Sequence, residues 1–229
     1  MIRIITPELY ASSSPLLRQM HRLRYRVFKE RLQWDVETFG DEEHDHFDRL
    51  DPTYVLALDG DEDVVGCWRA LPTTGPNMLR DVFPQLLVDR AVPDSPTIWE
   101  CSRFALECAP GGDNCLASVN TLTSELFCGL IHHCLEQDIE QVVTVYDVRI
   151  ARILPRVGVT PIWRTKPQRI GKVSALVGLF EISEEVLASV LEHAGFLGLR
   201  DHGQGQLEPI TALPPMAEMP QSGVPAHVG

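Results

Sequence analysis

Charged and aromatic residues are mixed over a short N-terminal stretch of the sequence. The segment WDVETFGDEEHDHFDRLD, residues 34–51, holds eight carboxylates, one arginine and three large aromatic residues. The preceding segment HRLRYRVFKERLQ, residues 21–33, holds five Arg or Lys residues. Carboxylates bind cations, guanidinium groups bind carboxylates, and aromatic faces attract positive charge. A plain solvated loop does not need such aromatic residues, so the stretch raises the question of what its charges and rings bind together.

Charge lies beside aromatic or like-charged residues in four places of the sequence. They are Arg24 with Phe28 and Trp34; Asp45 with Asp48; Arg69 after Trp68; and Glu100 with Arg103 and Phe104. Widespread catalytic patterns are missing: there is no G-x-G-x-x-G after a predicted strand, no Walker A sequence, no G-x-S-x-G and no H-E-x-x-H. The six cysteines form no C-x-x-C pair, so we predict buried thiols and no metal site.

Length and composition favour one globular domain. The chain has 229 residues, of which 44% are hydrophobic and 23% charged, as is ordinary for a globular protein. From about residue 200 the sequence is rich in Pro and Gly, so we predict a domain over residues 1–199 and a disordered tail over residues 200–229. The net charge of −12 argues against a nucleic-acid partner. No apolar run is long enough for membrane insertion and no signal peptide is evident, so we expect a cytoplasmic protein.

The spacing of apolar residues predicts a mixed α/β fold. Helices are expected at residues 14–32, 116–137, 149–158 and 183–195. Strands are expected at residues 2–6, 53–58, 64–71, 98–106, 140–148 and 172–182, the second and third as an antiparallel hairpin. The acidic stretch has no period and is expected to be a loop. This order of elements favours one mixed sheet with helices on both faces.

Several separate segments resemble a known family. They are RYRVFKERLQW with FGDEEHDHFD, then GCWRALPTTGPNML, then FP, and then IWECSRFAL. In this pattern the sequence is similar to the acyl-homoserine-lactone synthases, the autoinducer synthases of bacterial quorum sensing. The resemblance covers about residues 3–196, and its matching positions are Arg24, Phe28, Trp34, Asp45, Asp48, Arg69, Glu100 and Arg103. Ala70, beside the arginine of the second segment, is a small departure from the family pattern.

The resemblance implies a fold, a reaction and its substrates. The implied fold is a single-domain three-layer α/β/α sandwich with a mixed, mostly antiparallel sheet, similar to the N-acetyltransferases. The amine of S-adenosylmethionine attacks the carbonyl of an acyl thioester, and its carboxylate then closes on the carbon that bears the sulfonium. The products are an N-acyl-homoserine lactone, methylthioadenosine and the free thiol carrier. S-adenosylmethionine is a substrate in this reaction, so no cofactor is expected.

The charges of S-adenosylmethionine suit the N-terminal stretch. Its ammonium needs an anionic partner, its carboxylate a cationic one, and its sulfonium is attracted to aromatic faces. With the resemblance in hand, we assign its binding to Arg24, Phe28, Trp34, Asp45, Asp48, Arg103 and Phe104. Asp45 and Asp48 would hold the ammonium and order the loop. Arg24 and Arg103 would hold the carboxylate or brace the aspartates, and Phe28 and Trp34 would cover the adenosyl-sulfonium portion.

Each of these assignments has a structural alternative. Arg24 and Asp45 could form only an intramolecular ion pair, and Trp34 could be only a core aromatic residue. The remaining acids of the stretch are expected to form a solvated face: Asp41, Glu42 and Glu43.

Acylation also needs a base, because an ammonium has no lone pair until its proton leaves. Glu100 is the candidate base, directly or through a water, and Arg69 and Asp45 are the other predicted catalytic residues. Strict strand alternation would place Glu100 and Arg103 on opposite faces of the sheet, so a β-bulge between them is needed to bring both to the site. The structural alternative is an ion pair between Glu100 and Arg69.

The acyl chain needs an apolar slot. The walls are expected to be the long helix and the strand at residues 142–148. Three residues would line one side of that strand: Thr144, Tyr146 and Val148. By the resemblance, this region sets acyl length and the preference for a 3-oxo group. Tyr146 is bulky and is expected to shorten the slot, although a tyrosine in a strand is more often a packing residue.

The carrier of the acyl group needs a docking surface. From residue 148 to residue 180 the sequence has seven basic residues and no acidic one. Arg149, Arg152 and Arg156 are spaced for one helix face. A basic patch on an acidic protein indicates a specific anionic partner. We predict that this partner is acyl carrier protein or the phosphates of acyl-CoA.

Two other functions are compatible with parts of the pattern. One is an acetyl-CoA-dependent N-acetyltransferase of the same fold, whose pyrophosphate loop [RQ]-x-x-G-x-[GA] is not found here. The other is a non-catalytic small-molecule sensor, which would not need all the charged and aromatic positions. Release of methylthioadenosine distinguishes the lactone-forming reaction from both.

Overall fold

The protein is described by a computed structural model that covers residues 1–107 and 115–195. The main sheet consists of β1 (Ile2–Ile5), β4 (Thr53–Leu58), β5 (Val64–Pro72), β6 (Ile98–Leu106), β7 (Gln141–Asp147), β8 (Trp163–Arg164), β9 (Gln168–Ile170) and β10 (Val173–Glu181). A small hairpin is formed by β2 (Thr38–Phe39) and β3 (Glu42–Glu43). The α-helices are α1 (Ser14–Arg24), α2 (Met78–Asp81), α3 (Cys115–Glu136), α4 (Val148–Ile153) and α5 (Glu184–His193). The predicted tail lies outside the described residues.

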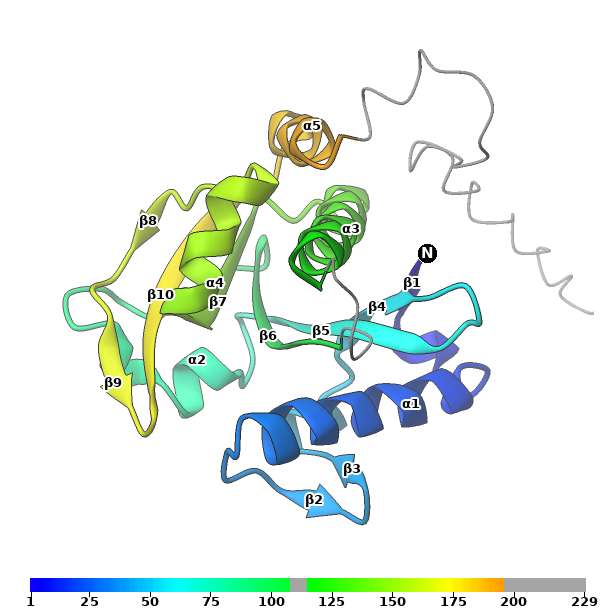
Figure 1. Cartoon of the computed structure of the whole chain (residues 1–229). Coiled ribbons are helices and arrows are strands. Elements are labelled where there is room, and N and C mark those ends of the chain that lie inside the picture. The colour runs from blue at the N-terminus through cyan, green and yellow to red at the C-terminus, as the bar shows by residue number, and fades with distance from the viewer. Residues whose placement is uncertain (108–114, 196–229) are drawn as a thin grey trace, which may run out of the picture.

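The sheet lies between two helical layers. Its strand order is β1-β4-β5-β6-β7-β10-β8, with β9 paired to β10, and every pairing is antiparallel except that of β6 with β7. Helices α3, α4 and α5 cover one face, and α1 covers the other, where α2 also packs (Figure 1). The structure therefore confirms the predicted three-layer sandwich with a mixed, mostly antiparallel sheet. Among the described residues, no helix has the length and apolarity needed to cross a membrane.

The sheet opens at its centre. Strands β6 and β7 pair only from Ile98 with Gln141 to Cys101 with Thr144. Beyond that pair β6 runs on to residue 106 and β7 to residue 147, with no further pairing between them. The two strands thus part in the middle of the sheet, where neither α1 nor α3 belongs to the ladder. We call this place the strand split.

A β-bulge lies in β6 next to the strand split. Cys67 pairs with Ala105 and Arg69 with Ser102, so three residue steps in β6 oppose two in β5. Arg103 takes up the extra residue in a left-handed conformation with φ of 59°. A non-glycine residue rarely adopts this conformation, which marks a position fixed by its surroundings. The bulge that the sequence required between Glu100 and Arg103 is therefore present.

The helix predicted over residues 14–32 changes its winding part-way. Its α-helical part ends at Arg24, and a π-helix continues over Tyr25–Arg31. Wider turns of this kind occur mostly at functional sites. The acidic stretch, expected to be a loop, contains the β2–β3 hairpin and a 3-10 turn, η3 (His46–Arg49). This order packs the stretch onto α1, where loop residues would have stayed in water.

Candidate active site

Three arginines and three carboxylates gather between α1 and the sheet. The arginines come from α1, β5 and β6, and the carboxylates from β3 and from the start of η3; they are Arg24, Arg69, Arg103, Glu43, Asp45 and Asp48. We call this set the ionic cluster. Arg24 and Glu43 are fully buried, and Arg69 is 1% exposed. Equal numbers of opposite charges make such burial tolerable, because each ion has partners at hydrogen-bonding distance.

Arg24 joins two of the acids. Its Nη1 and Nη2 donate to the two carboxylate oxygens of Asp48 at 2.7 and 2.9 Å, and its Nε donates to Glu43 at 2.5 Å. The Asp48 pair is bidentate, the strongest arrangement of an arginine with a carboxylate. Arg24 therefore braces the acidic stretch, which is one of the two roles predicted for it.

Arg69 and Arg103 hold the opposite side of the same acids. Arg69 Nη1 donates to Asp45 at 2.5 Å and to Asp48 at 2.9 Å. Arg103 donates to Glu43 at 3.0 Å and lies 2.8 Å from Asp45 Oδ2. These contacts reach Arg103 only because the bulge turns its side chain toward α1. Asp45 thus pairs with Arg69 and Arg103, and not with Arg24 as the structural alternative supposed.

The two aspartates are fixed as well as charged. Asp45 caps η3 and exchanges hydrogen bonds with Asp48 in a capping box, in which each carboxylate accepts from the other residue's backbone N–H. Burial raises the pKa of Asp48, but Arg24 and Arg69 outweigh it and hold that pKa well below its usual range. The pKa of Asp45 is also lowered, since Arg69 and Arg103 outweigh its burial. Both carboxylates are therefore ionised at neutral pH.

Glu43 belongs to the ionic cluster, although it was expected on a solvated face. Its side chain is completely buried and accepts hydrogen bonds from Arg24 and Arg103. The prediction was wrong because β2 and β3 form a hairpin of two residues per strand, too short to show a period in the sequence. The neighbouring acids do remain at the surface, where Arg22 pairs with Asp41.

Glu100 lies beside the ionic cluster without joining it directly. It is fully buried, and its Oε2 accepts a hydrogen bond of 3.2 Å from Ser102, whose hydroxyl in turn accepts from Arg69. Its Oε1 has no hydrogen-bond partner among the described residues. Burial raises the pKa of Glu100 to about 7, with Arg69 and Ser102 opposing the shift. The predicted ion pair with Arg69 is therefore replaced by a link through Ser102, a residue the sequence did not single out.

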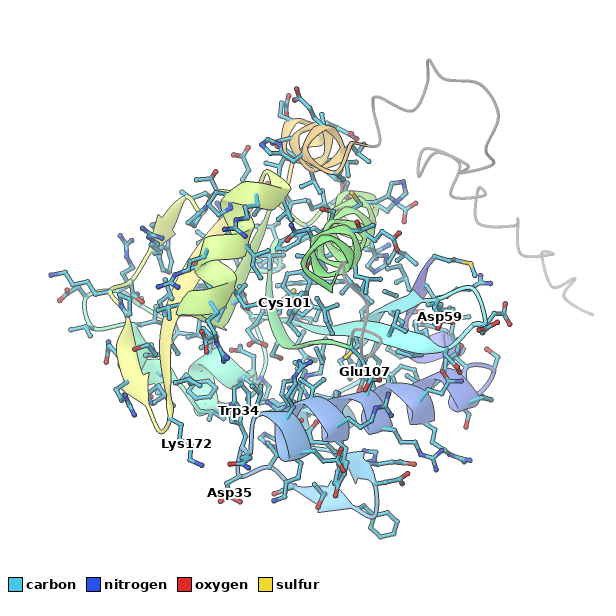
Figure 2. All side chains as sticks on the ribbon, viewed as in Figure 1. Trp34, Asp35, Asp59, Cys101, Glu107 and Lys172 are labelled. Carbon is cyan, nitrogen blue, oxygen red and sulfur yellow. The ribbon has the colours of Figure 1, made fainter. Side chains whose placement is uncertain are left out.

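The predicted aromatic residues separate onto two faces. Phe28 and Trp34 stack with ring centroids 5.2 Å apart, and the Arg103 guanidinium lies 5.5 Å from the Phe28 ring, beside the ionic cluster. Figure 2 shows Trp34 where the helical segment after α1 ends. Phe104 instead packs against Trp68 in the core on the α3 face. Its assignment beside S-adenosylmethionine conflicts with this position, since the bulge sends Arg103 and Phe104 to opposite faces.

The predicted acyl-slot residues lie on the α3 face at the strand split. Thr144 pairs with Cys101 at the last rung of the β6–β7 ladder, and Figure 2 shows Cys101 between β6 and α3. Tyr146 follows on the same face of β7 and is 7% exposed. Val148 is not in the strand: Asp147 caps a new helix and Val148 is its first residue. It still packs against the same apolar cluster.

The predicted carrier-binding arginines are at the surface of α4 and of the following 3-10 turn, η5 (Leu154–Val157). Arg149, Arg152 and Arg156 are all exposed. Arg149 forms a bidentate pair with Asp147, which lies just outside the segment free of acids. Arg152 and Arg156 form no ion pair with any described residue. The charge available to a partner therefore lies on Arg152 and Arg156 more than on Arg149.

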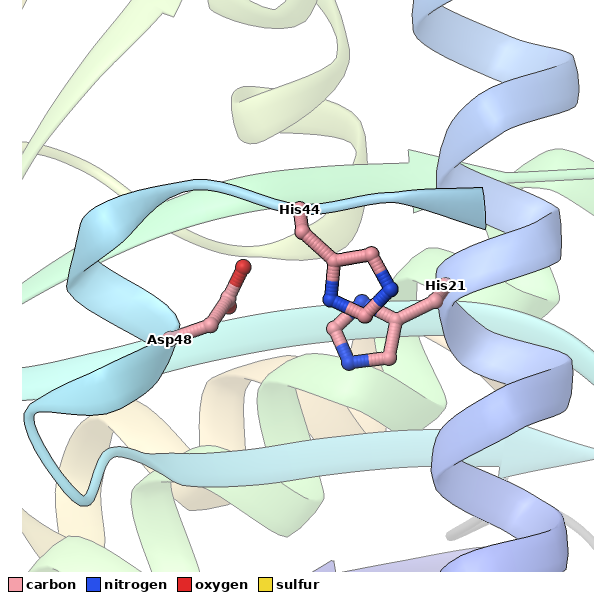
Figure 3. Close-up of side chains that lie close together, drawn as sticks. All are labelled: His21, His44 and Asp48. Atoms are coloured by element: carbon pink, nitrogen blue, oxygen red, sulfur yellow. The ribbon is translucent and has the colours of Figure 1, made fainter. Parts of the chain in front are cut away.

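A histidine pair next to Asp48 is the one group of described residues with the spacing of metal ligands. The ligand atoms of His21, His44 and Asp48 lie within 4.8 Å of one another (Figure 3). The two imidazole rings stack at 3.8 Å, and His21 Nδ1 lies 2.9 Å from the Glu43 carbonyl. Both Asp48 oxygens already accept from Arg24, whose charge opposes that of a metal ion. This group is better suited to structural packing than to metal binding.

Comparison with known proteins identifies the family. Residues 8–190 match the sequence model of the autoinducer synthases. The chain belongs to the autoinducer synthase family. An acyl-homoserine-lactone synthase from Rhizobium radiobacter is 36% identical over 178 residues, which cover 78% of this chain and 84% of the relative. One from Pseudomonas aeruginosa is 41% identical over 145 residues, or 62% of this chain and 71% of the relative.

Solved structures of this family share the fold. The AHL synthase LasI superposes with a TM-score of 0.73 at 35% identity, covering 84% of this chain and 94% of LasI. The CoA-dependent acyl-homoserine lactone synthase BjaI, solved with SAM and isopentyl-CoA, has a TM-score of 0.73 at 29% identity, covering 85% of this chain and 89% of BjaI. A Lactobacillus plantarum protein assigned as an N-acetyltransferase matches in fold alone, with a TM-score of 0.52 at 11% identity. As an autoinducer synthase, the protein is an acyltransferase with an N-acetyltransferase-like fold, as predicted.

Proposed function

We propose that this autoinducer synthase binds S-adenosylmethionine at the ionic cluster, acylates its amine from a thioester and closes the lactone with release of methylthioadenosine. The observation that carries the proposal is Glu100, a buried carboxylate with a pKa near neutrality, placed between the ionic cluster and the strand split. A base must accept a proton from the substrate ammonium before the amine can attack. A carboxylate with a pKa of about 7 is substantially ionised at neutral pH and can take that proton.

The ionic cluster divides the binding work among its members. Both oxygens of Asp48 already accept from Arg24, whereas Asp45 lies closer to Glu100 through Arg69 and Arg103. We therefore assign the ammonium to Asp45 and give Asp48 the task of fixing the acidic stretch. Arg103 is the best partner for the substrate carboxylate, because it also lies over the Phe28 ring that would face the sulfonium portion.

The strand split gives the acyl group a route between the two faces of the sheet. Glu100 and Arg69 lie on the α1 face, whereas Thr144 and Tyr146 lie on the α3 face. A thioester carbonyl held at the split would meet the amine from the α1 side and direct its acyl chain to the α3 side. Backbone N–H groups freed from the ladder there are suited to the oxygen of the tetrahedral intermediate, which breaks down by expelling the thiol.

The acyl donor is assigned by charge. Arg152 and Arg156 offer unpaired positive charge beside the α3 face, which suits either an acidic carrier protein or the phosphates of coenzyme A. The CoA-dependent BjaI has the same fold, and an acidic carrier remains the alternative. Both donors are therefore included in the test.

The test is a product analysis of the purified protein. It is incubated with S-adenosylmethionine and a series of acyl thioesters, carried either by acyl carrier protein or by coenzyme A. We expect equimolar methylthioadenosine and N-acyl-homoserine lactone, measured by mass spectrometry. Acylation of an amine without methylthioadenosine would support an ordinary N-acetyltransferase instead. Absence of both products with every donor would contradict any acyl transfer to S-adenosylmethionine.

A further inference from the structure

Tyr146 occupies a boundary position in the sheet. It follows the last β6–β7 rung, Cys101 with Thr144, on the same face of β7. Across the sheet the order of strands is β6, β7, β10 and β8. The strand split therefore lies on one side of Tyr146, and the surface of β10 and β8 lies on the other.

The Tyr146 ring is seated by shape and not by a hydrogen bond. Its hydroxyl is buried and has no hydrogen-bond partner among the described residues. The ring packs against Phe180 with centroids 5.8 Å apart and lies over Gly178. A Cβ at position 178 would stand only 2.8 Å from the Tyr146 hydroxyl oxygen, so the ring needs glycine there. A buried hydroxyl without a partner is costly, and such groups call for an explanation in function.

A cavity lies beyond the ring. Its volume is about 420 Å³, and it lies between α4, η5 and the chain that leads into β8. Besides Tyr146, the side chains that define it are mostly apolar: Ala151, Leu154, Val159, Pro161, Trp163 and Arg164. Tyr146 thus stands between this cavity and the strand split, where the proposed acyl slot begins.

We propose that Tyr146 is the wall that ends the acyl slot, so that the protein prefers short acyl donors and the cavity beyond the ring is excluded from the slot. This inference rests on the proposed function, because it assumes that an acyl chain enters at the strand split. It adds a specificity-determining residue and a class of substrate. Removing the ring would join the slot to the cavity, and each further methylene buried there is worth about fourfold in kcat/KM.

The experiment compares chain-length profiles. The values of kcat/KM are measured for unsubstituted acyl thioesters of increasing length, with wild type, Tyr146→Ala and Tyr146→Phe. Tyr146→Ala should move the optimum by at least two methylenes and raise the rate for the longer donor, relative to the wild-type optimum, by roughly tenfold. Tyr146→Phe keeps the ring, so it should keep the wild-type order of donors whatever its absolute rate.

A second substitution makes the test reversible. Ala151 lines the cavity, so adding Ala151→Leu to Tyr146→Ala should fill the new space and return the optimum toward short chains. Should Tyr146→Ala fail to fold, Tyr146→Leu gives the same comparison with a smaller shift. An unchanged order of donors in the active alanine or leucine variant overturns the inference, as does the same shift in Tyr146→Phe. Loss of methylthioadenosine release from wild type with all donors would instead overturn the proposed function.

Discussion

The two faces of the sheet at the strand split are built by opposite means. On the α1 face, three arginines and three carboxylates fix one another with contacts of 2.5–3.0 Å. On the α3 face, Tyr146 and its apolar neighbours are positioned by packing alone, next to a cavity of about 420 Å³. The charged face has one arrangement that satisfies every ion. The apolar face can accept other shapes at modest cost.

This difference separates chemistry from selectivity. A transition state needs charges that do not move when the reaction starts, and a network of buried ion pairs supplies them. Acyl chains differ only in length and in few polar atoms, so a pocket of adjustable volume can discriminate among them. Substitutions on the α1 face should therefore change rate or stability for every donor. Substitutions on the α3 face should change which donor is preferred.

The largest effect is expected from Glu100→Gln. Loss of the base should lower kcat/KM by about 10²–10⁴-fold for every donor alike. In wild type, kcat/KM should rise with pH and level off above about 7, because Glu100 must be ionised to accept the proton. The variant should lose that rise. A variant that kept both the rate and the pH profile would exclude Glu100 as the base.

The same substitution has an opposite effect on stability, which separates catalysis from folding. Since burial raises the pKa of Glu100 from 4.5 to about 7, the folded state holds its proton more tightly than the unfolded state does. Its contribution to stability is then greatest at low pH and falls as pH rises between those two values. Glu100→Gln removes this loss, so the variant should gain in melting temperature relative to wild type as pH rises toward 8.

The next largest effect is expected from Arg24→Ala. It leaves Asp48 and Glu43 buried with too little positive charge, which should cost about 3–5 kcal/mol of unfolding free energy. The matched control is Arg22→Ala, two residues away on α1. Its pair with Asp41 is exposed and should be worth about 0–1 kcal/mol. Urea denaturation measures both, and equal costs would mean that the ionic cluster does not order the α1 face.

The sequence predicted the charged face better than the apolar one, for physical reasons. Arg24, Asp45 and Asp48 announce themselves by charge, and the structure brings them together. Glu43 was missed because a two-residue strand has no readable period, and Ser102 because a hydroxyl has no charge to attract notice. Phe104 was misplaced because the fate of residues after a β-bulge depends on which of them absorbs the extra step, and that is set by tertiary contacts.

The cavity beside Tyr146 also lay beyond prediction. The sequence indicated an apolar slot and a bulky residue in it. It could not show that Gly178, on another strand, leaves room for the ring, because strand pairing and register decide that neighbour. Packing on the apolar face is thus a property of the assembled sheet, whereas the ionic partners are partly written in residue types.

The smallest effect is expected outside both faces, at the surface of α4. Reversing the charge of Arg152 and Arg156 to glutamate should raise the apparent KM for a carrier-linked donor by about threefold to tenfold and leave kcat unchanged, because these charges guide association and do not touch the reacting atoms. The effect should shrink as salt screens the charges. The matched control reverses Arg3 and Arg18, two exposed arginines on β1 and α1, with the same change in net charge. An equal rise in KM from the control would mean that net charge, and not a docking surface on α4, governs the encounter.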